Sequence, residues 1–336
     1  MEMSKAANVP FQIVRTHHAE LRVRDLEAAR TFYVDLLGFV ETERTADALY
    51  LRGLEEAYHH SLVLRLSDRA ACDHIAFKVA TPADVEAARA HFEARGFPVR
   101  VLGSGEELGQ GGSVRVQDPM GFPMEFFYEM DNAESHLRRF DRYRGAFPMR
   151  LDHVNIFVAD AQAAHEYYTD GLGFRCSEYT ETDREPRRIW GSWLHRKDSV
   201  HDIATTNGDG PRLHHLGFWV QDTASVLRAC DILAAAGFGD SIERGPGRHG
   251  ISNAFFLYLR DPDRHRIELY TGDYLTADPD LAPLRWSVAD PKRGTFWGHK
   301  APASWFEEGT PVVSILSGEN MPVRSPVLGD RPDFAT

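Results

Sequence analysis

Two histidines and one glutamate stand out because their side chains suit a metal ion. His153 lies in Leu-Asp-His-Val-Asn, His215 in Arg-Leu-His-His-Leu, and Glu268 in Arg-Ile-Glu-Leu-Tyr. Two imidazoles and one carboxylate bind Fe(II) or Mn(II) on one face and leave other coordination positions open. Such positions let a substrate chelate the metal while O2 binds beside it. We therefore predict that His153, His215 and Glu268 are the ligands of a metal ion.

The sequence repeats itself, and these residues occupy equivalent places in the repeats. Tyr-Tyr-Thr-Asp-Gly-Leu-Gly-Phe near position 167 resembles Phe-Tyr-Val-Asp-Leu-Leu-Gly-Phe near position 32, and each follows a histidine, His153 or His18, at the same distance. His215 and His74 share a second spacing pattern. The repeats, which alternate between two types, span about 16–68, 72–130, 151–206 and 213–271. Recurrence at equivalent places argues against a chance set of packed core histidines.

Each repeat is expected to form a βαβββ unit. It opens with a strand whose residues alternate between two faces, as in His153–Val158, and continues with a helix and three more strands. Asp25 is the expected N-cap of the first helix, Gly38 is its expected stop, and Thr81-Pro82 is expected to start the second. The predicted fold class is α+β, with four βαβββ units paired into two half-open barrel domains whose inner faces line a cleft.

The repeats divide the chain into an N-terminal domain (1–148), expected to be non-catalytic, a metal-binding C-terminal domain (149–272) and a tail (273–336). The charged segment 131–149 is expected to form a helix that joins the domains. The tail has no clear periodicity and is expected to wrap the domains or to act as a lid. Its last roughly 15 residues are expected to be disordered.

His214 competes with His215 for the role of ligand. Side chains alternate along a strand, so the two imidazoles are expected to point in opposite directions. The equivalence with His74 selects His215. His214 is then expected to be a packing residue or a partner of the ligands.

Other polar residues are expected to face the same cleft. His201, expected in a late strand of the third repeat, can move a proton near neutral pH, and the phenol of Tyr258 can donate to a bound oxygen anion. The loop Glu243–Gly250 carries Arg244 and His249 but lacks the Gly-Lys-Ser/Thr ending of a phosphate loop. An arginine and a histidine beside a metal favour a carboxylate on the substrate. Structural roles in the core or in a solvated loop are the alternatives.

Composition excludes several classes of partner. A net charge of −12 argues against nucleic acid or an anionic membrane. No apolar run approaches the roughly 18 residues of a membrane span, and no apolar signal core is expected. The three cysteines lack CxxC spacing and are typical of a reduced protein, so a cytoplasmic location is expected.

Several motifs together resemble one family. They are Trp-Leu-His-Arg-Lys (Trp193–Lys197), Val-His-Asp (Val200–Asp202), Gly-Pro-Arg-Leu-His-His (Gly210–His215), Glu-Arg-Gly-Pro-Gly-Arg-His-Gly (Glu243–Gly250) and Arg-Ile-Glu-Leu-Tyr-Thr (Arg266–Thr271). With the four βαβββ units, they are similar to the type I extradiol ring-cleaving dioxygenases of the vicinal oxygen chelate superfamily, over roughly residues 16–310. The resemblance implies an Fe(II) enzyme, with Mn(II) as the alternative metal, that cleaves a catechol with O2 to a muconic semialdehyde. It implies 3,4-dihydroxyphenylacetate, or else another substituted catechol, as substrate, and a homotetramer.

The resemblance also implies roles for residues beside the metal. His201 would steady bound oxygen and act as an acid–base group. Tyr258 would hydrogen-bond a substrate oxygen, and Asn155 would contact oxygen or substrate.

The implied pocket for the ring's side chain involves Trp193, Arg244 and His249, which would shape it and hold a carboxylate. The family pattern has an Arg-Arg pair before Trp-Trp-Gly. This chain has Lys-Arg-Gly-Thr-Phe-Trp-Gly instead, so only Arg293 of that pair is present to bind substrate.

Two other functions fit parts of the pattern. A glyoxalase- or isomerase-like lyase of this fold needs a second carboxylate facing the metal, and His201 and Tyr258 stand in the equivalent places. Drug-binding members of the superfamily are two-unit chains without the metal ligands. Both alternatives therefore rank below oxygen chemistry.

The N-terminal half carries a copy of the ligand set. His18, His74 and Glu125 stand at the places equivalent to the three predicted ligands. Arg115 stands where the catalytic half has its tyrosine, and Glu20 where it has its asparagine. Because a nearby arginine disfavours a dication, a hydrogen-bonded cluster is favoured over a second metal site, which stays open as the alternative.

Overall fold

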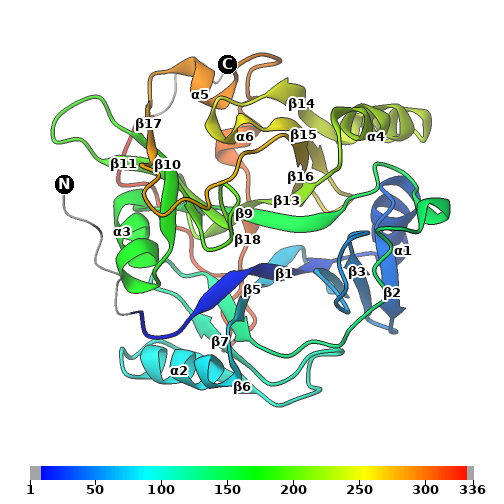
Figure 1. Ribbon diagram of the computed structural model, residues 1–336, viewed down its shortest axis with the longest axis horizontal. Coiled ribbons are helices and arrows are strands. Elements are labelled where there is room, and N and C mark those ends of the chain that lie inside the picture. Colours follow the sequence, from blue (N-terminus) through cyan, green and yellow to red (C-terminus); the bar gives the residue numbers. More distant parts are fainter. Residues whose placement is uncertain (1–8, 331–336) are drawn as a thin grey trace.

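A computed structural model describes residues 9–330, and its elements follow the four predicted repeats (Figure 1). The first two modules contain β1 (Ile13–Val23), α1 (Leu26–Arg30), η1 (Thr31–Leu36), β2 (Val40–Arg44), β3 (Ala48–Arg52), β4 (Leu62–Leu66), β5 (Ala71–Val79), α2 (Pro82–Glu93), β6 (Val99–Leu102), β7 (Ser113–Gln117) and β8 (Pro123–Phe127). The last two contain β9 (Arg150–Val158), α3 (Ala161–Glu166), η3 (Tyr167–Gly171), β10 (Arg175–Glu181), β11 (Ile189–His195), β12 (Ile203–Asn207), β13 (Arg212–Trp219), α4 (Thr223–Ala235), η4 (Gly239–Ser241), β14 (Ile242–Arg248), η5 (Ile251–Asn253), β15 (Phe255–Arg260) and β16 (Arg266–Thr271). The predicted βαβββ units are confirmed.

Local sequence accounts for where the helices begin and end. Asp25 caps α1 by accepting hydrogen bonds from two backbone N–H groups of its first turn, and Thr81 caps α2 just before Pro82. The first helix continues as the π-helix η1 and stops at Gly38, whose φ of +88° favours glycine. These predicted cap and stop residues are confirmed.

Each half of the chain builds one open mixed sheet. The strand orders are β2-β3-β4-β1-β5-β8-β7-β6 and β14-β15-β16-β13-β9-β12-β11-β10-β17, in which β17 (Leu284–Ser287) comes from the tail. In each sheet the first strands of the two modules are antiparallel neighbours, and each is flanked by the parallel last strand of its own module. Neither sheet closes, so the half-open arrangement is confirmed. The predicted ligands lie on these central strands.

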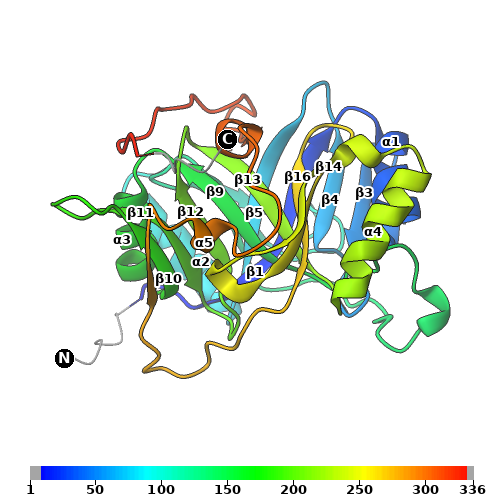
Figure 2. The ribbon, with the colours of Figure 1, turned by 90° about the horizontal axis from the view of Figure 1, so that it is seen from above.

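The two sheets share one core, with helices outside it. Figure 1 shows α2, α3 and α4 at the periphery, and Figure 2 shows α3 and α4 on opposite sides of the central strands. One buried apolar cluster runs through both halves, and aromatic pairs such as Phe39 with Phe218 join them. No helix within residues 9–330 is long and apolar enough to cross a membrane.

The segment between the halves does not form the predicted helix. Within residues 131–149 only Phe140–Arg142 makes a short 3-10 turn, η2, and the remainder is irregular. Gly145 (φ +61°) and Phe147 (φ +39°) adopt left-handed backbone conformations, and Pro148 supplies no N–H. A continuous helix cannot pass through these residues.

The tail packs against both domains. Its elements are β17 (Leu284–Ser287), α5 (Pro291–Gly294), α6 (Ser304–Glu307) and β18 (Thr310–Pro311). β17 extends the sheet beside β10, and β18 pairs with β13. The predicted disorder is wrong for residues 322–330, because Arg324 and Gly210 exchange backbone hydrogen bonds of 2.7 and 3.0 Å. The rest of that prediction falls on residues 331–336, which lie outside the described residues.

Candidate metal centre

The structure brings His153, His215 and Glu268 together at the centre of the C-terminal sheet. The Nε2 atoms of the histidines lie 3.3 Å apart, and Oε2 of Glu268 lies 2.9 Å from that of His153 and 3.2 Å from that of His215. Metal–ligand bonds of about 2.1 Å at right angles separate neighbouring ligand atoms by about 3.0 Å. All three side chains are buried. The three atoms thus fit one face of an octahedral divalent ion.

The strand register explains this convergence. β13 lies between β9 and β16, so Gly217 on β13 pairs with His153 on one side and with Glu268 on the other. A Cβ atom on Gly217 would overlap the imidazole of His153. Glycine is therefore required here, which the histidine pattern alone did not reveal.

A chain of hydrogen bonds decides which nitrogen of each histidine is available to a metal. Nδ1 of His153 lies 3.3 Å from the carboxylate of Asp152, which leaves Nε2 as the ligand atom. Nε2 of His214 lies 2.9 Å from the carbonyl oxygen of Trp305, which can only accept. Nδ1 of His214 therefore accepts from Nδ1 of His215 at 2.6 Å. The Nε2 lone pairs of both His153 and His215 are then left for the metal.

Strand alternation predicted that the imidazoles of His214 and His215 point in opposite directions, and this prediction is wrong. The pairing of β13 with β9 shifts register between Leu213 and His215, which breaks the strict alternation of side chains. The ring centroids of His214 and His215 lie 4.9 Å apart, and both rings line one pocket. His214 is the hydrogen-bond partner of His215. This is one of the two roles expected for His214.

The charges of the ligand set are arranged for a cation. Burial raises the pKa of Glu268, but His153 and His215 outweigh it and hold this pKa well below its usual range. Burial also opposes a charge on His153, yet Asp152 and Glu268 raise its pKa to about 9. Burial lowers the pKa of His215 to about 4. At neutral pH His153 therefore carries a second proton, on Nε2, which a metal ion must displace.

The ligand atoms open into a pocket of about 760 Å³, its mouth included. The structure brings to this pocket all seven residues that we predicted around the metal: Asn155, Trp193, His201, Arg244, His249, Tyr258 and Arg293. His201 and Tyr258 lie beside the ligands, and Arg244 and Arg293 make another part of the lining positively charged.

Trp305, in the tail helix α6, also lines the pocket and was not predicted. Its ring centroid lies 4.3 Å from that of Tyr258. The buried guanidinium of Arg266 holds this segment by donating to the carbonyl oxygens of Ser304 and Glu308 at 3.0 and 3.1 Å. No signal in the aperiodic tail marks Trp305, because its place depends on contacts with residues distant along the chain.

Two candidate proton carriers flank the metal position. His201 lies in the loop before β12, not in a strand as predicted, and its ring centroid is 4.0 Å from that of His153. Burial, and to a smaller extent the charge of His153, hold the pKa of His201 well below its usual range. This imidazole is therefore neutral and can accept a proton. Burial, and to a smaller extent the negative charge of Glu268, raise the pKa of Tyr258 well above its usual range. The phenol therefore keeps its proton.

Tyr258 and His249 form a hydrogen bond with a defined direction. Nδ1 of His249 donates to the carbonyl oxygen of Gly294, which can only accept. Burial and then Arg244 lower the pKa of His249 to about 3, so its Nε2 carries no proton. Nε2 therefore accepts from the hydroxyl of Tyr258 at 2.9 Å.

One side of the pocket is positively charged. Arg244 is 4% exposed, lies over the ring of Trp305 and donates to the carbonyl oxygen of Gly294. Burial lowers the pKa of Arg244 to about 10, and burial followed by repulsion from Arg244 lowers that of Arg293 to about 10. Both guanidiniums stay charged at neutral pH, and an anion between them would relieve their repulsion.

Asn155 and Trp193 complete the lining. The amide oxygen of Asn155 accepts from the hydroxyl of Thr206 at 3.1 Å, which leaves its N–H groups to offer. Trp193 packs with Val200 and Ile251 in a small apolar cluster. The pocket thus has an apolar wall beside its polar groups.

Fold and site together define a metal-binding protein of the vicinal oxygen chelate type. The chain belongs to the Glyoxalase/Bleomycin resistance protein/Dioxygenase superfamily, which matches residues 15–126 and 150–269, and within it to the extradiol dioxygenases. The manganese-dependent 2,3-dihydroxybiphenyl 1,2-dioxygenase of Geobacillus genomosp. 3 is 36% identical over 299 residues, which cover 85% of this chain and 94% of that protein.

Solved structures agree with this assignment. Homoprotocatechuate 2,3-dioxygenase from Arthrobacter globiformis superposes with a TM-score of 0.90 at 43% identity, covering 96% of this chain and 99% of that chain. The anaerobic complex of the Brevibacterium fuscum homoprotocatechuate 2,3-dioxygenase with 3,4-dihydroxyphenylacetate has a TM-score of 0.91 at 42% identity, covering 96% and 100%. The resemblance predicted from the motifs is confirmed.

Proposed function

We propose that this protein cleaves the ring of a catechol beside its diol with O2, and that 3,4-dihydroxyphenylacetate is the catechol. One observation carries the proposal: the open face of His153, His215 and Glu268 shares a pocket with the buried guanidiniums of Arg244 and Arg293. A diol at the metal and a carboxylate at the arginines are the two ends of such a substrate. The relative crystallised with 3,4-dihydroxyphenylacetate supports this choice.

We propose Fe(II) as the metal, held by His153, His215 and Glu268. When bound, such an ion supplies Lewis acidity and electron transfer at neighbouring open positions for the diol and O2. The same ligand set accepts Mn(II), and one relative is named as manganese-dependent. Metal-free protein reloaded with either ion tests this choice. We expect faster turnover with Fe(II), and equal or faster turnover with Mn(II) would overturn it.

The protein's own groups then handle the protons. Neutral His201 takes a proton from the diol and returns it as the ring opens. When substrate is bound, the single hydroxyl proton of Tyr258 turns from Nε2 of His249 to a substrate oxygen. Asn155 offers its free amide N–H to bound oxygen.

The substrate's side chain is assigned to the other end of the pocket. Arg244 and Arg293 bind its carboxylate, and Trp193 supplies an apolar wall. His249 links this end to the diol end through Tyr258. These contacts exclude water from the ring and orient it.

Oxygen consumption tests the reaction. Protein loaded with Fe(II) without air is mixed with 3,4-dihydroxyphenylacetate and O2, and we expect a yellow product and equal consumption of O2 and substrate. Glu268→Gln, which removes one metal ligand, is the inactive control. No O2 uptake with any catechol would refute the proposal. Uptake with unsubstituted catechol alone would refute only the substrate.

We further propose a homotetramer located in the cytoplasm. The tetramer follows the family resemblance, and the free thiols of Cys72, Cys176 and Cys230 fit a reducing compartment. Light scattering after gel filtration measures the assembly, and cell fractionation measures the location. A monomer, or recovery outside the cytoplasmic fraction, would refute the corresponding statement.

A further inference from the structure

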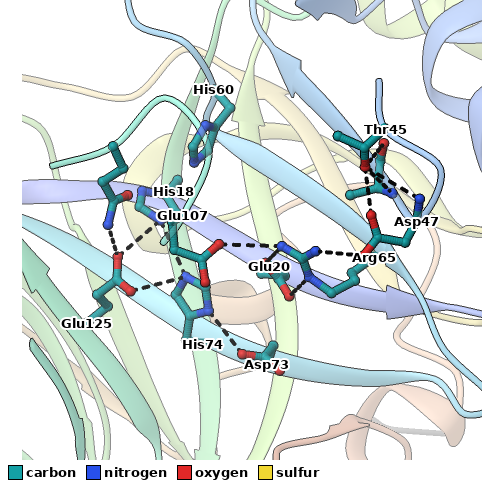
Figure 3. A network of polar contacts seen from close by, with 12 residues as sticks. His18, Glu20, Thr45, Asp47, His60, Arg65, Asp73, His74, Glu107 and Glu125 are labelled. Atoms are coloured by element: carbon teal, nitrogen blue, oxygen red, sulfur yellow. Dashed lines mark hydrogen bonds and ion pairs between the residues drawn. The ribbon is translucent and has the colours of Figure 1, made fainter. Parts of the chain in front are cut away.

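The N-terminal sheet holds a second set of the same three ligand types (Figure 3). His18 on β1, His74 on β5 and Glu125 on β8 are all buried. The Nε2 atoms of the histidines are 3.3 Å apart, and the carboxylate oxygens of Glu125 lie 3.5 Å from that of His18 and 3.9 Å from that of His74. Nδ1 of His74 lies 3.2 Å from Asp73, so its Nε2 faces the cluster, as a carboxylate orients His153 in the catalytic half.

In this cluster, N–H donors already use lone pairs that a metal ion needs. Arg115 donates to Oε2 of Glu125 at 2.7 Å and contacts Nε2 of His74 at 3.4 Å. Gln110 donates to the other carboxylate oxygen of Glu125 at 2.6 Å. Two of the three ligands are therefore engaged by the cation of Arg115.

The catalytic half has a neutral group at the corresponding place. Arg115 pairs with Glu125 between β7 and β8, as Tyr258 pairs with Glu268 between β15 and β16. The hydroxyl of Tyr258 is neutral and donates to Nε2 of His249 at 2.9 Å, so this residue places no cation beside Glu268. One residue type at one register position thus distinguishes the two sets.

A second difference sets the spacing of the ligands. Gly217 pairs with both His153 and Glu268, and its counterpart Ala76 pairs with both His18 and Glu125. A Cβ atom at Gly217 would overlap the imidazole beside it, so Ala76 keeps its histidine from the equivalent close position. The histidine Nε2 atoms are 3.3 Å apart in both sets, but Glu125 lies farther from its histidines, at 3.5 and 3.9 Å, than Glu268 does at 2.9 and 3.2 Å. A tetrahedral set with bonds of about 2.1 Å, which Zn(II) prefers, needs separations of about 3.4 Å.

We propose that His18, His74 and Glu125 form a latent Zn(II) site, which the guanidinium of Arg115 blocks by taking the place of the cation. Arg115 also pairs with Glu107 at 2.7 Å and with Asp73 at 3.3 Å. These carboxylates remain when Arg115 is replaced, and they favour a dication in its place.

Counting metal ions per chain tests the proposal. The test uses three full-length proteins: wild type, Arg115→Met and Arg115→Met/His18→Ala. Each is stripped of metal with a chelator, saturated with Zn(II) and freed of unbound ion. Elemental mass spectrometry then measures the zinc content per chain. We expect one, two and one ions per chain, since the catalytic set binds one ion in each protein. Two ions in wild type, or one in folded Arg115→Met, would overturn the proposal.

A second variant tests the proposal if Arg115→Met does not fold, because removing one partner of a buried ion pair is destabilising. Arg115→Gln is neutral, and its amide can still donate to Glu125. We expect it also to bind two Zn(II) ions, and circular dichroism reports whether each variant is folded. Mn(II), which prefers octahedral sites, is expected to give one ion per chain throughout. A second Mn(II) ion in Arg115→Met would overturn the tetrahedral assignment.

Discussion

Hydrogen-bond donors around the histidines, more than the ligand types themselves, separate the catalytic set from its N-terminal copy. Asp152 and His214 accept the Nδ1 protons of the two histidine ligands, which leaves both Nε2 lone pairs for a metal. In the N-terminal half, Arg115 occupies lone pairs of the corresponding ligands. The same three residue types therefore serve two purposes in one chain.

Replacing His201 separates proton transfer from metal binding. His201 borders His153 but is not one of the three converging ligands. We expect His201→Phe to retain its metal and to lower kcat about 100- to 10,000-fold, the range for a positioned acid–base group. Metal analysis and O2 uptake are measured on the same sample. His214→Phe is the opposite control: it removes the partner of His215, so metal affinity should fall about 10- to 100-fold. Loss of metal from His201→Phe would contradict its role.

Arg244 is expected to select for the substrate's carboxylate. A hydrogen bond to a charged group contributes about 1.5–3 kcal/mol, so Arg244→Met should lower kcat/KM for 3,4-dihydroxyphenylacetate about 10- to 100-fold. Turnover of unsubstituted catechol should change little, because that substrate has no carboxylate. Arg248→Met is the matched control, since Arg248 lies on the same strand but bonds to the carbonyl oxygen of Asn253. An equal loss for both substrates would show that Arg244 acts on the site as a whole.

At the scale of elements, the placement of β13 between β9 and β16 makes the metal set, and Gly217 makes that placement possible. Gly217→Ala forces the imidazole of His153 to move. Overpacking of this kind costs about 1–3 kcal/mol, so we expect metal affinity to fall about 5- to 150-fold. Competition with a chelator of known affinity measures it. Ala76→Gly, at the equivalent position, should leave the metal content unchanged while Arg115 is present. Unaltered affinity in Gly217→Ala would contradict this account.

The repeats explain how much of this site the sequence predicts. His153, His215 and Glu268 were found because each repeat keeps its spacing, and spacing within a module determines where a strand residue lies. The direction of His214 depends on a register shift between two strands from different modules, which no local pattern encodes. Trp305 escaped prediction for the same reason, because Arg266, far from it along the chain, fixes its place.

At the scale of the whole molecule, two tyrosine–aspartate pairs join the halves in equivalent ways. The hydroxyl of Tyr33 donates to Asp261 at 3.0 Å, and that of Tyr168 donates to Asp118 at 2.7 Å. The tyrosines come from η1 and η3, and the aspartates follow β15 and β7. All four side chains are buried. The repeat that builds each domain thus also supplies the contacts between domains.

The pair of Tyr168 and Asp118 makes the stability of the protein depend on pH. Burial raises the pKa of Asp118 to about 6, although the hydrogen bond from Tyr168 opposes the shift. An unfolded aspartate titrates near about 3.9, so the folded protein holds this proton more tightly. The resulting stabilisation is complete below about pH 4 and is lost as pH rises through about 6. A shift of about two units corresponds to about 3 kcal/mol in the free energy of unfolding.

Asp118→Asn isolates this effect because its amide is neutral at every pH. From pH 4 to pH 7 we expect the free energy of unfolding of Asp118→Asn, relative to wild type, to rise by about 2 kcal/mol. Denaturant unfolding of both metal-stripped proteins at pH 4, 5, 6 and 7 measures it. Tyr168→Phe removes the hydrogen bond that favours the carboxylate, so its pKa should rise further and the pH dependence should steepen. Parallel curves for wild type and Asp118→Asn would show that folding leaves the pKa of Asp118 unshifted.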